Sequence, residues 1–333
     1  MINTKMSGLI KGAQIALKER YNLRAGQKVL VFHDLPKKKI GAAFVEAARN
    51  LGAEVKVFQI GKERFAGDTQ ERLAAALSGH SFALIINVLK SLVEETPDRV
   101  NLGKMETGPD TVIAHCPEIE EAMLKIKINF GEMIDNARKL LENLKAASEV
   151  HIKTALGTDV KIDIRGREFH DDIIPRTSGI TNFPCGELFC APVESGTNGT
   201  VIADASTTSL GILPQPLKLE INGGRLTSLQ WLNAPARNNR LLAKLRASLS
   251  QDDEAGLTGE LGIGLASYPI CGNMLQDEKV AGTIHIAFGF NRNFGGRNNS
   301  KSHFDFLVRD PELTVYYPDR PPQTIMRAGK LLI

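Results

Sequence analysis

The chain has 333 residues, and its 42% hydrophobic and 24% charged residues are typical of a folded protein rather than a disordered one. The net charge of +3 is too small to indicate a nucleic-acid partner. No apolar run approaches the roughly 20 residues that span a bilayer, and the first residues lack the apolar core of a signal peptide, so we expect a cytoplasmic protein without a membrane partner.

The first part of the chain alternates predicted strands and helices. Short apolar runs predict the strands, and apolar residues at helical spacing predict the helices. The strands are expected at residues 28–33, 54–60, 82–89 and 111–115, and the helices at 40–51 and 69–77. This alternation implies a mostly parallel sheet with right-handed crossovers. The loop after the first strand lacks GxGxxG, so a dinucleotide site is not indicated.

The pattern changes after an amphipathic helix predicted at residues 134–147. Alternating strands around Gly157 and around Gly223-Gly224 predict two hairpins. The hairpins pair 149–154 with 159–165 and 217–222 with 225–231, and a helix at 238–249 and strands at 280–288, 304–308 and 313–317 follow. We therefore predict an α/β domain with a mostly parallel sheet at residues 1–148, and an α+β domain rich in antiparallel strands at residues 149–333.

Five side chains that could bind metal ions stand out in the second domain, each within apolar or glycine-rich sequence. They are Glu187, Glu260, His285, His303 and Asp305. Burying several carboxylates together is costly unless a cation neutralises them. Residues two apart on a strand point to the same face, so His303 and Asp305 would present an imidazole and a carboxylate side by side. Three carboxylates and two imidazoles suit two metal ions with a shared carboxylate and a bridging water.

Each of these residues also has a purely structural explanation. A single acid in an apolar stretch can accept hydrogen bonds from backbone amides in a loop. A histidine in an apolar strand is more often a satisfied core residue than a ligand. The predicted metal site in the second domain therefore depends on the combination of five residues rather than on any one of them.

The sequence around these residues resembles the four motifs of the aminopeptidase T family of metallopeptidases, in the same order. The matching residues are Asn182, Pro184, Glu187, Phe189, Ala191 and Pro192 in the first motif, Glu260 in the second, His285 to Gly289 in the third, and Asn298, Ser300, His303 and Asp305 in the fourth. The N-terminal half is similar to the family only in its α/β pattern.

This resemblance implies a homodimeric aminopeptidase that removes N-terminal residues from peptides. It implies two divalent metal ions, either zinc, cobalt or manganese, which lower the pKa of a bridging water and polarise the scissile carbonyl. Either Glu187 or Glu260 would be the proton shuttle, and either could bridge the ions.

The third motif departs from the family at one position. Family members carry a tyrosine a few residues after the histidine, whereas this chain has Phe290-Asn291-Arg292-Asn293-Phe294. Arg292 or Asn291 is expected to occupy the space of the tyrosine, and Arg292 is the candidate catalytic residue of the two. The glycines that follow, Gly295-Gly296, are interpreted as part of a loop over the site.

The family also carries an acid just before the same histidine. Glu278 is the candidate in this chain, at a longer spacing from His285, and we count it among the candidate metal ligands. The alternative is a surface charge, because Glu278 stands between Asp277 and Lys279.

The same residues are compatible with other functions. Ring-cleaving dihydroxypyridine dioxygenases are distantly similar on the same scaffold and also lack the tyrosine. A mononuclear iron enzyme of that type would use His285, His303 and Asp305 as its ligands. An amide hydrolase for a non-peptide small molecule would use the two-ion site. A binding module that kept only the scaffold would lack a ligand, whereas the main set here is complete.

Overall fold

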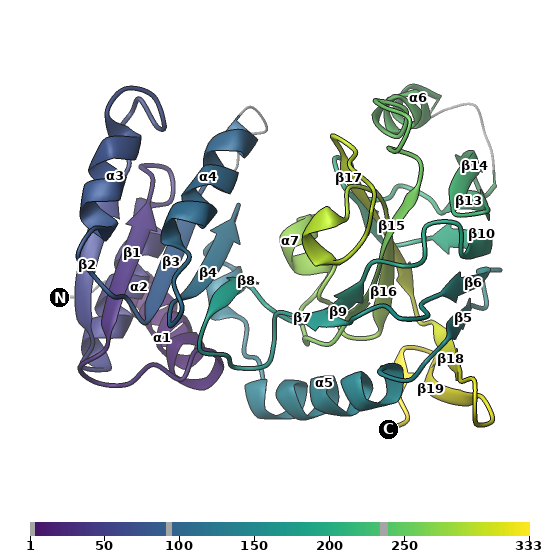
Figure 1. Cartoon of the computed structure of the whole chain (residues 1–333), viewed down its shortest axis with the longest axis horizontal. Helices are drawn as coiled ribbons and strands as arrows, with labels where there is room; N and C mark the ends of the chain where they lie inside the picture. Colours follow the sequence, from purple (N-terminus) through teal and green to yellow (C-terminus); the bar gives the residue numbers. More distant parts are fainter. Residues whose placement is uncertain (1–3, 91–94, 234–238) are drawn as a thin grey trace. The chain divides into compact units, whose positions relative to one another are not determined.

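The computed structural model describes residues 4–90, 95–233 and 239–333 (Figure 1). The chain forms two compact units. Unit 1 comprises residues 1–131 and 172–185, and unit 2 comprises residues 132–171 and 186–333. The single boundary predicted near residue 148 falls inside unit 2, because most of the helix before it belongs to unit 2 and the chain returns to unit 1 at residue 172. Every described helix is too short or too polar to cross a membrane.

Unit 1 is built on a five-stranded sheet in which all pairings are parallel. Its spatial order is β2-β1-β3-β4-β8. The strands are β1 (Lys28–His33), β2 (Glu54–Gln59), β3 (Leu84–Leu89), β4 (Val112–Pro117) and β8 (Gly179–Asn182). The first four confirm the predicted strands to within a few residues. The fifth, β8, comes from the segment that returns from unit 2.

The helices of unit 1 pack as α1 on α2 and α3 on α4 (Figure 1). They are α1 (Thr4–Ile15), continued by η1 (Ala16–Arg20), α2 (Lys38–Asn50), α3 (Thr69–Leu77), α4 (Thr96–Glu106) and the short η3 (Met123–Lys125). Leu73 of α3 and Leu102 of α4 are buried in one cluster with Phe32 and Phe58, whose rings stack with centroids 5.2 Å apart. Burial of this apolar surface stabilises the α/β layer.

Unit 2 contains two antiparallel sheets, as the hairpin patterns predict. The eight-stranded sheet has the order β14-β13-β10-β6-β5-β18-β19-β20. Its strands are β5 (Glu149–Lys153), β6 (Asp159–Asp163), β10 (Thr197–Ala203), β13 (Leu217–Asn222), β14 (Arg225–Trp231), β18 (Glu312–Tyr316), β19 (Gln323–Arg327) and β20 (Lys330–Leu331). The predicted fold class, a parallel α/β part followed by an antiparallel part, is thereby confirmed.

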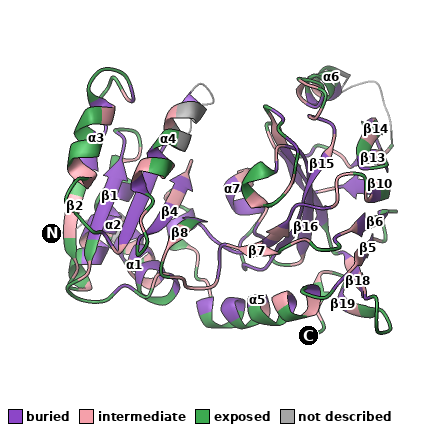
Figure 2. Ribbon diagram, viewed as in Figure 1, coloured by how far each residue is buried: buried purple, intermediate pink, exposed green. Residues whose placement is uncertain are grey.

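The seven-stranded sheet of unit 2 has the order β12-β11-β17-β16-β15-β9-β7. Its strands are β7 (His170–Asp171), β9 (Glu187–Cys190), β11 (Ser206–Thr207), β12 (Gly211–Ile212), β15 (Thr258–Gly264), β16 (Thr283–Gly289) and β17 (His303–Arg309). β15 and β16 are buried along their whole lengths (Figure 2). Any polar side chain on these two strands therefore needs a partner inside the protein.

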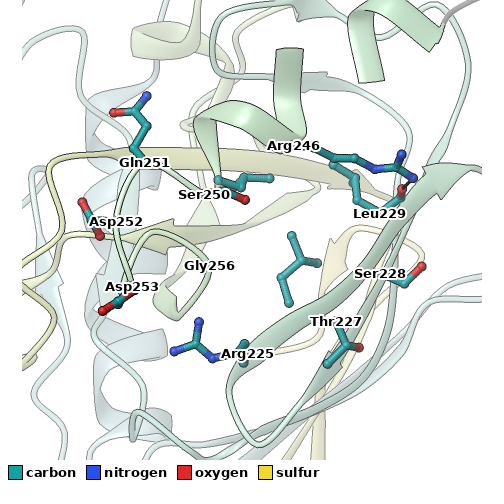
Figure 3. Close-up of a pocket in the computed structure, with 12 residues that line it drawn as sticks. Arg225, Thr227, Ser228, Leu229, Arg246, Ser250, Gln251, Asp252, Asp253 and Gly256 are labelled. Atoms are coloured by element: carbon teal, nitrogen blue, oxygen red, sulfur yellow. Dashed lines mark hydrogen bonds between the residues drawn. The ribbon is translucent and has the colours of Figure 1, made fainter. Parts of the chain in front are cut away.

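The helices of unit 2 are α5 (Phe130–Leu144), α6 (Asn239–Ser248), α7 (Met274–Asp277) and the short η5 (Arg292–Phe294). Residue 238, the predicted start of α6, lies outside the described residues. A hollow of about 750 Å³ lies between α6 and β14 (Figure 3), where Arg225 and Arg246 are among the lining residues. Its lining includes none of the five predicted metal ligands.

Candidate metal centre

One face of the seven-stranded sheet carries all five predicted ligands. β9 provides Glu187, β15 provides Glu260, β16 provides His285, and β17 provides His303 and Asp305. The register pairs Gly262 with His285, and it pairs Ala287 with both Glu260 and Asp305. Residues directly opposite each other on antiparallel strands share a face. Side chains that are far apart in the sequence are therefore brought together by strand pairing.

Small residues between these side chains make room for them. A Cβ atom on Gly262 would lie 2.0 Å from both Cε1 and Nε2 of His285, so the imidazole lies directly across the backbone of β15. Any residue other than glycine at position 262 would place its Cβ where the ring of His285 lies. Glycine inside a strand weakens it, and a close approach by another group is a usual reason for its presence.

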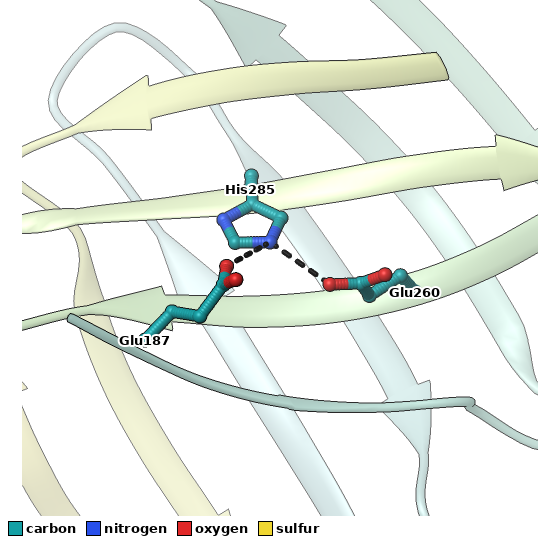
Figure 4. Close-up of side chains that lie close together, drawn as sticks. All are labelled: Glu187, Glu260 and His285. Carbon is teal, nitrogen blue, oxygen red and sulfur yellow. Dashed lines mark hydrogen bonds and ion pairs between the residues drawn. The ribbon is translucent and has the colours of Figure 1, made fainter. Parts of the chain in front are cut away.

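His285 joins the two glutamates into a first donor set (Figure 4). Its Nε2 lies 3.1 Å from Oε1 of Glu260 and 3.4 Å from Oε2 of Glu187. One ligand atom from each of the three residues lies within 4.8 Å of the others, and all three residues are buried. This is a set of one nitrogen and two oxygen donors around one point.

A second donor set shares Glu260 with the first. The other carboxylate oxygen of Glu260, Oε2, lies 3.3 Å from Nε2 of His303. The same nitrogen lies 3.4 Å from Oδ1 of Asp305. Glu260 thus turns one oxygen toward each set, and it is the residue that the two sets have in common.

Neighbouring groups fix the orientation of the second set. Nδ1 of His303 lies 2.8 Å from the carbonyl oxygen of Phe290, to which it donates, so Nε2 faces the carboxylates. Thr208 donates its hydroxyl to Oδ2 of Asp305 at 2.9 Å and accepts from the Asp305 backbone N–H at 3.0 Å. Support of this kind holds a ligand in one orientation before an ion binds.

Lys279 is part of the cluster, although it was not among the predicted site residues. Its side chain is fully buried, and Nζ lies 2.7 Å from Oε1 of Glu187. The same ammonium also bonds Glu278. Asp277 is buried as well, because it accepts hydrogen bonds from the backbone N–H groups of Cys271 and Gly272. Three consecutive charged residues carry no apolar signal, so this burial cannot be predicted from the local pattern.

The two remaining candidates are placed differently. Glu278 bonds Lys279 next to the first donor set. Burial raises the pKa of Glu278, despite the opposing charge of Lys279. Arg292 is exposed, and its Nε donates to the carbonyl oxygen of Arg297 at 3.3 Å. Among the described residues no contact joins Arg292 to either donor set.

The carboxylates favour positive charge at both histidines. Burial would lower the pKa of His285, but the hydrogen bond to Glu260 and the charges of Glu187 and Asp305 raise it to about 9. Burial also opposes protonation of His303, but Asp305 and Glu260 raise the pKa of that imidazole well above its ordinary value. Burial would raise the pKa of Glu260, whereas its hydrogen bonds to the two histidines lower it. Both donor sets therefore attract a cation.

The chemistry of these groups fits a divalent metal ion. Ligand atoms at 3.1–3.4 Å from one another have the separation expected around an ion that binds each of them at about 2.0–2.2 Å. Oδ1 of Asp305 is buried and has no hydrogen-bond partner among the described residues. Imidazole nitrogens with carboxylate oxygens suit zinc, cobalt, manganese or iron.

Comparison with known proteins agrees with this assignment. Residues 128–331, which include both donor sets, match the thermophilic metalloprotease (M29) family. No curated protein sequence matches the chain. A structure of 2,5-dihydroxypyridine dioxygenase from Pseudomonas putida KT2440 is 18% identical, with a TM-score of 0.72 over 98% of this chain and 97% of that one. Wild-type AmpT from Thermus thermophilus is also 18% identical, with a TM-score of 0.70 over 98% and 99%. At this identity, both structures indicate a shared fold.

Proposed function

The chain belongs to the thermophilic metalloprotease (M29) family, and on this premise we propose that it is an aminopeptidase with two metal ions. Membership of the family makes it a metal-dependent hydrolase. The finer assignment, removal of N-terminal residues from peptides by a water activated between two ions, is our proposal. The resemblance to aminopeptidase T that the four motifs carry supports it.

The shared position of Glu260 is the observation that carries this proposal. Its two oxygens lie 3.1 Å from Nε2 of His285 and 3.3 Å from Nε2 of His303. A carboxylate between two sets of donors is the arrangement that holds two ions a few ångströms apart. We therefore assign Glu260 as the shared ligand, with Glu187 and His285 on one side and His303 and Asp305 on the other.

The bound ions would supply a water of lowered pKa and a polarised carbonyl. The protein contributes the proton acceptor. Glu260 has an oxygen turned toward each donor set, whereas Glu187 turns Oε2 toward His285 and Oε1 toward the ammonium of Lys279. The acceptor is one of the two glutamates predicted as a shuttle, Glu187 or Glu260. His303, whose side chain is 33% exposed, lies where water and substrate can enter.

Metal content and hydrolysis, measured on the same preparation, test this function. We expect two zinc, cobalt or manganese ions per chain and release of the first amino acid from a dipeptide panel, with loss of both on chelation. Glu260→Gln should lower the metal content of both sites. The control is Glu312→Gln, which removes one charge from an exposed pair with Arg327 and should change neither quantity. Hydrolysis that survives complete metal removal would contradict the proposal.

A mononuclear iron dioxygenase is the second candidate. The two imidazoles and Asp305 supply two nitrogens and one carboxylate in one cluster, and the fold of a dioxygenase is as similar as that of an aminopeptidase. Three results together would favour the dioxygenase over the aminopeptidase. They are one iron per chain, oxygen consumption in the presence of a dihydroxypyridine, and no hydrolysis of any peptide.

A further inference from the structure

Four aromatic rings lead from the edge of the seven-stranded sheet to the metal centre. We call the set of His170, Phe189, Phe294 and His303 the aromatic wall. Successive ring centroids are 5.7 Å apart for His170 and Phe189, 5.3 Å for Phe189 and Phe294, and 6.4 Å for Phe294 and His303. The last two contacts are edge-to-face, with planes at 85° and 82°. The wall ends on a predicted metal ligand.

The pleat of the sheet places Phe189 on the same face as the ligands. Phe189 is two residues after Glu187 on β9, so the two side chains point to the same side. The register also pairs Phe189 with Gly262, the residue over which the ring of His285 lies. An aromatic ring is therefore next to the first donor set, on the side of the edge strand β7.

The second phenylalanine, Phe294, is held in place by its loop. The side-chain amides of Asn291 and Asn298 are buried and donate to carbonyl oxygens in β15 and β16 at 3.1 Å. The backbone N–H of Asn298 also donates to Oδ1 of Asn291 at 2.8 Å. Arg167 donates to the carbonyl oxygen of Gly295 at 2.9 Å. These bonds fix both ends of the turn that presents Phe294.

The wall nevertheless keeps accessible surface. Phe189, Phe294 and His170 are each only half-buried, and the side chain of His303 is 33% exposed. Rigid aromatic surface beside a polar centre stabilises an apolar group that covers it.

We propose that the aromatic wall binds the apolar side chain of the substrate residue that carries the free amine. This inference rests on the proposed aminopeptidase function and specifies its substrate class. The amine and the scissile carbonyl have to lie at the donor sets, which leaves the first side chain directed along one wall of the site. Phe294 and Phe189 provide aromatic contacts for phenylalanine or leucine and provide no counter-charge for an acidic or basic side chain.

Binding of amino acid hydroxamates tests the wall separately from catalysis. The full-length, zinc-loaded protein is titrated calorimetrically with the hydroxamates of phenylalanine and glycine, which share the metal-binding group and differ only in the side chain. We expect the phenylalanine compound to bind about tenfold more tightly or better. Equal affinities, or no binding of either compound, would overturn the inference.

Variants of Phe294 assign the preference to the wall. Phe294→Ser should bring the two affinities close together with the zinc content unchanged, whereas Phe294→Leu should keep most of the difference. Ile212→Ser, at a position that is 55% exposed, is the matched control and should keep all of it. A preference that persists in Phe294→Ser would place the apolar contact elsewhere and refute the proposal.

Hydrolysis of the corresponding amino acid p-nitroanilides then separates the two claims. Cleavage with no preference for phenylalanine or leucine over glycine and aspartate would support the aminopeptidase function and refute the role proposed for the aromatic wall. Selective hydroxamate binding without cleavage of any substrate would support apolar binding at the aromatic wall and refute the aminopeptidase function.

Discussion

Replacing Gly262 by alanine should remove a metal ligand without touching any ligand chemically. A Cβ at this position would lie 2.0 Å from Nε2 and Cε1 of His285, whereas an ordinary contact requires 3.4 Å or more. The imidazole must therefore move by about 1.4 Å or change rotamer. A shift of this size takes Nε2 out of the position 3.1 Å from Glu260, so the first donor set loses its nitrogen.

The expected magnitude follows from the burial of the ring. His285 is fully buried, so the displaced imidazole also strains a packed interior. Overpacking of this kind costs about 1–3 kcal/mol of folding stability. The loss of one of three ligands should lower the affinity of the first site by a factor of ten or more. The fold should survive, because the free energy of unfolding of a domain is usually about 5–15 kcal/mol.

Metal stoichiometry and unfolding of the metal-free protein measure the two effects. We expect Gly262→Ala to bind one ion fewer per chain, with a modest fall in its unfolding temperature. Gly61→Ala is the control, since a Cβ on Gly61 has no atom within 4 Å, and it should bind as many ions as the native chain. If Gly262→Ala keeps full metal content and affinity, the geometry assigned to His285 is wrong.

Three further predictions concern groups around the sheets. Lys279→Met removes the cation bonded to buried Glu187 and should destabilise the metal-free protein by about 3–5 kcal/mol, with a smaller loss once metal is bound; equal losses by calorimetry would refute this. Burial raises the pKa of Glu106 from 4.5 to about 8. Protonated Glu106 therefore stabilises the folded state fully below pH 4.5, and this stabilisation is lost as the pH rises to 8. The shift corresponds to about 5 kcal/mol, and Glu106→Gln should abolish that slope in urea unfolding measured across this range. Asn298→Ala leaves two carbonyl oxygens in the strands without their partner and should cost about 1–3 kcal/mol; an unchanged unfolding midpoint would contradict it.

Local sequence patterns were sufficient for most of the fold. The apolar runs predicted as strands form β1 to β4, of which β1, β3 and β4 are mostly buried. The hairpin turn at Gly223-Gly224 has both residues at positive φ. The strand β8 was not predicted, since four residues with only one buried among them carry too little signal. Its place beside β4 depends on a chain that leaves unit 1 and returns. No pattern within a window of ten residues contains that information.

The metal centre, like the fold, was predictable from the sequence only in part. The closeness of His303 and Asp305 follows from strand periodicity alone, and their donor atoms are 3.4 Å apart. Periodicity could not decide which glutamate faces both histidines, because that depends on the pairing of β15 with both β9 and β16. Lys279 was not predicted as part of the site, since its burial results from tertiary packing. Arg292, a candidate from its sequence position, is exposed.

Charge balance connects the number of ions to the choice between the two functions. The cluster contains four carboxylates, those of Glu187, Glu260, Glu278 and Asp305, and one ammonium, that of Lys279. All five side chains are at least four-fifths buried. Two divalent ions and one hydroxide cancel the three excess negative charges when Glu278 is ionised. A single divalent ion is sufficient when Glu278 holds a proton, because the excess is then two negative charges. Burial favours that proton by raising the pKa of Glu278. The dinuclear hydrolase therefore requires an ionised Glu278, and the mononuclear oxygenase is compatible with a protonated one. Glu278→Gln should consequently lower the occupancy of a two-ion site and leave that of a one-ion site nearly unchanged, so metal analysis of this single variant bears on both.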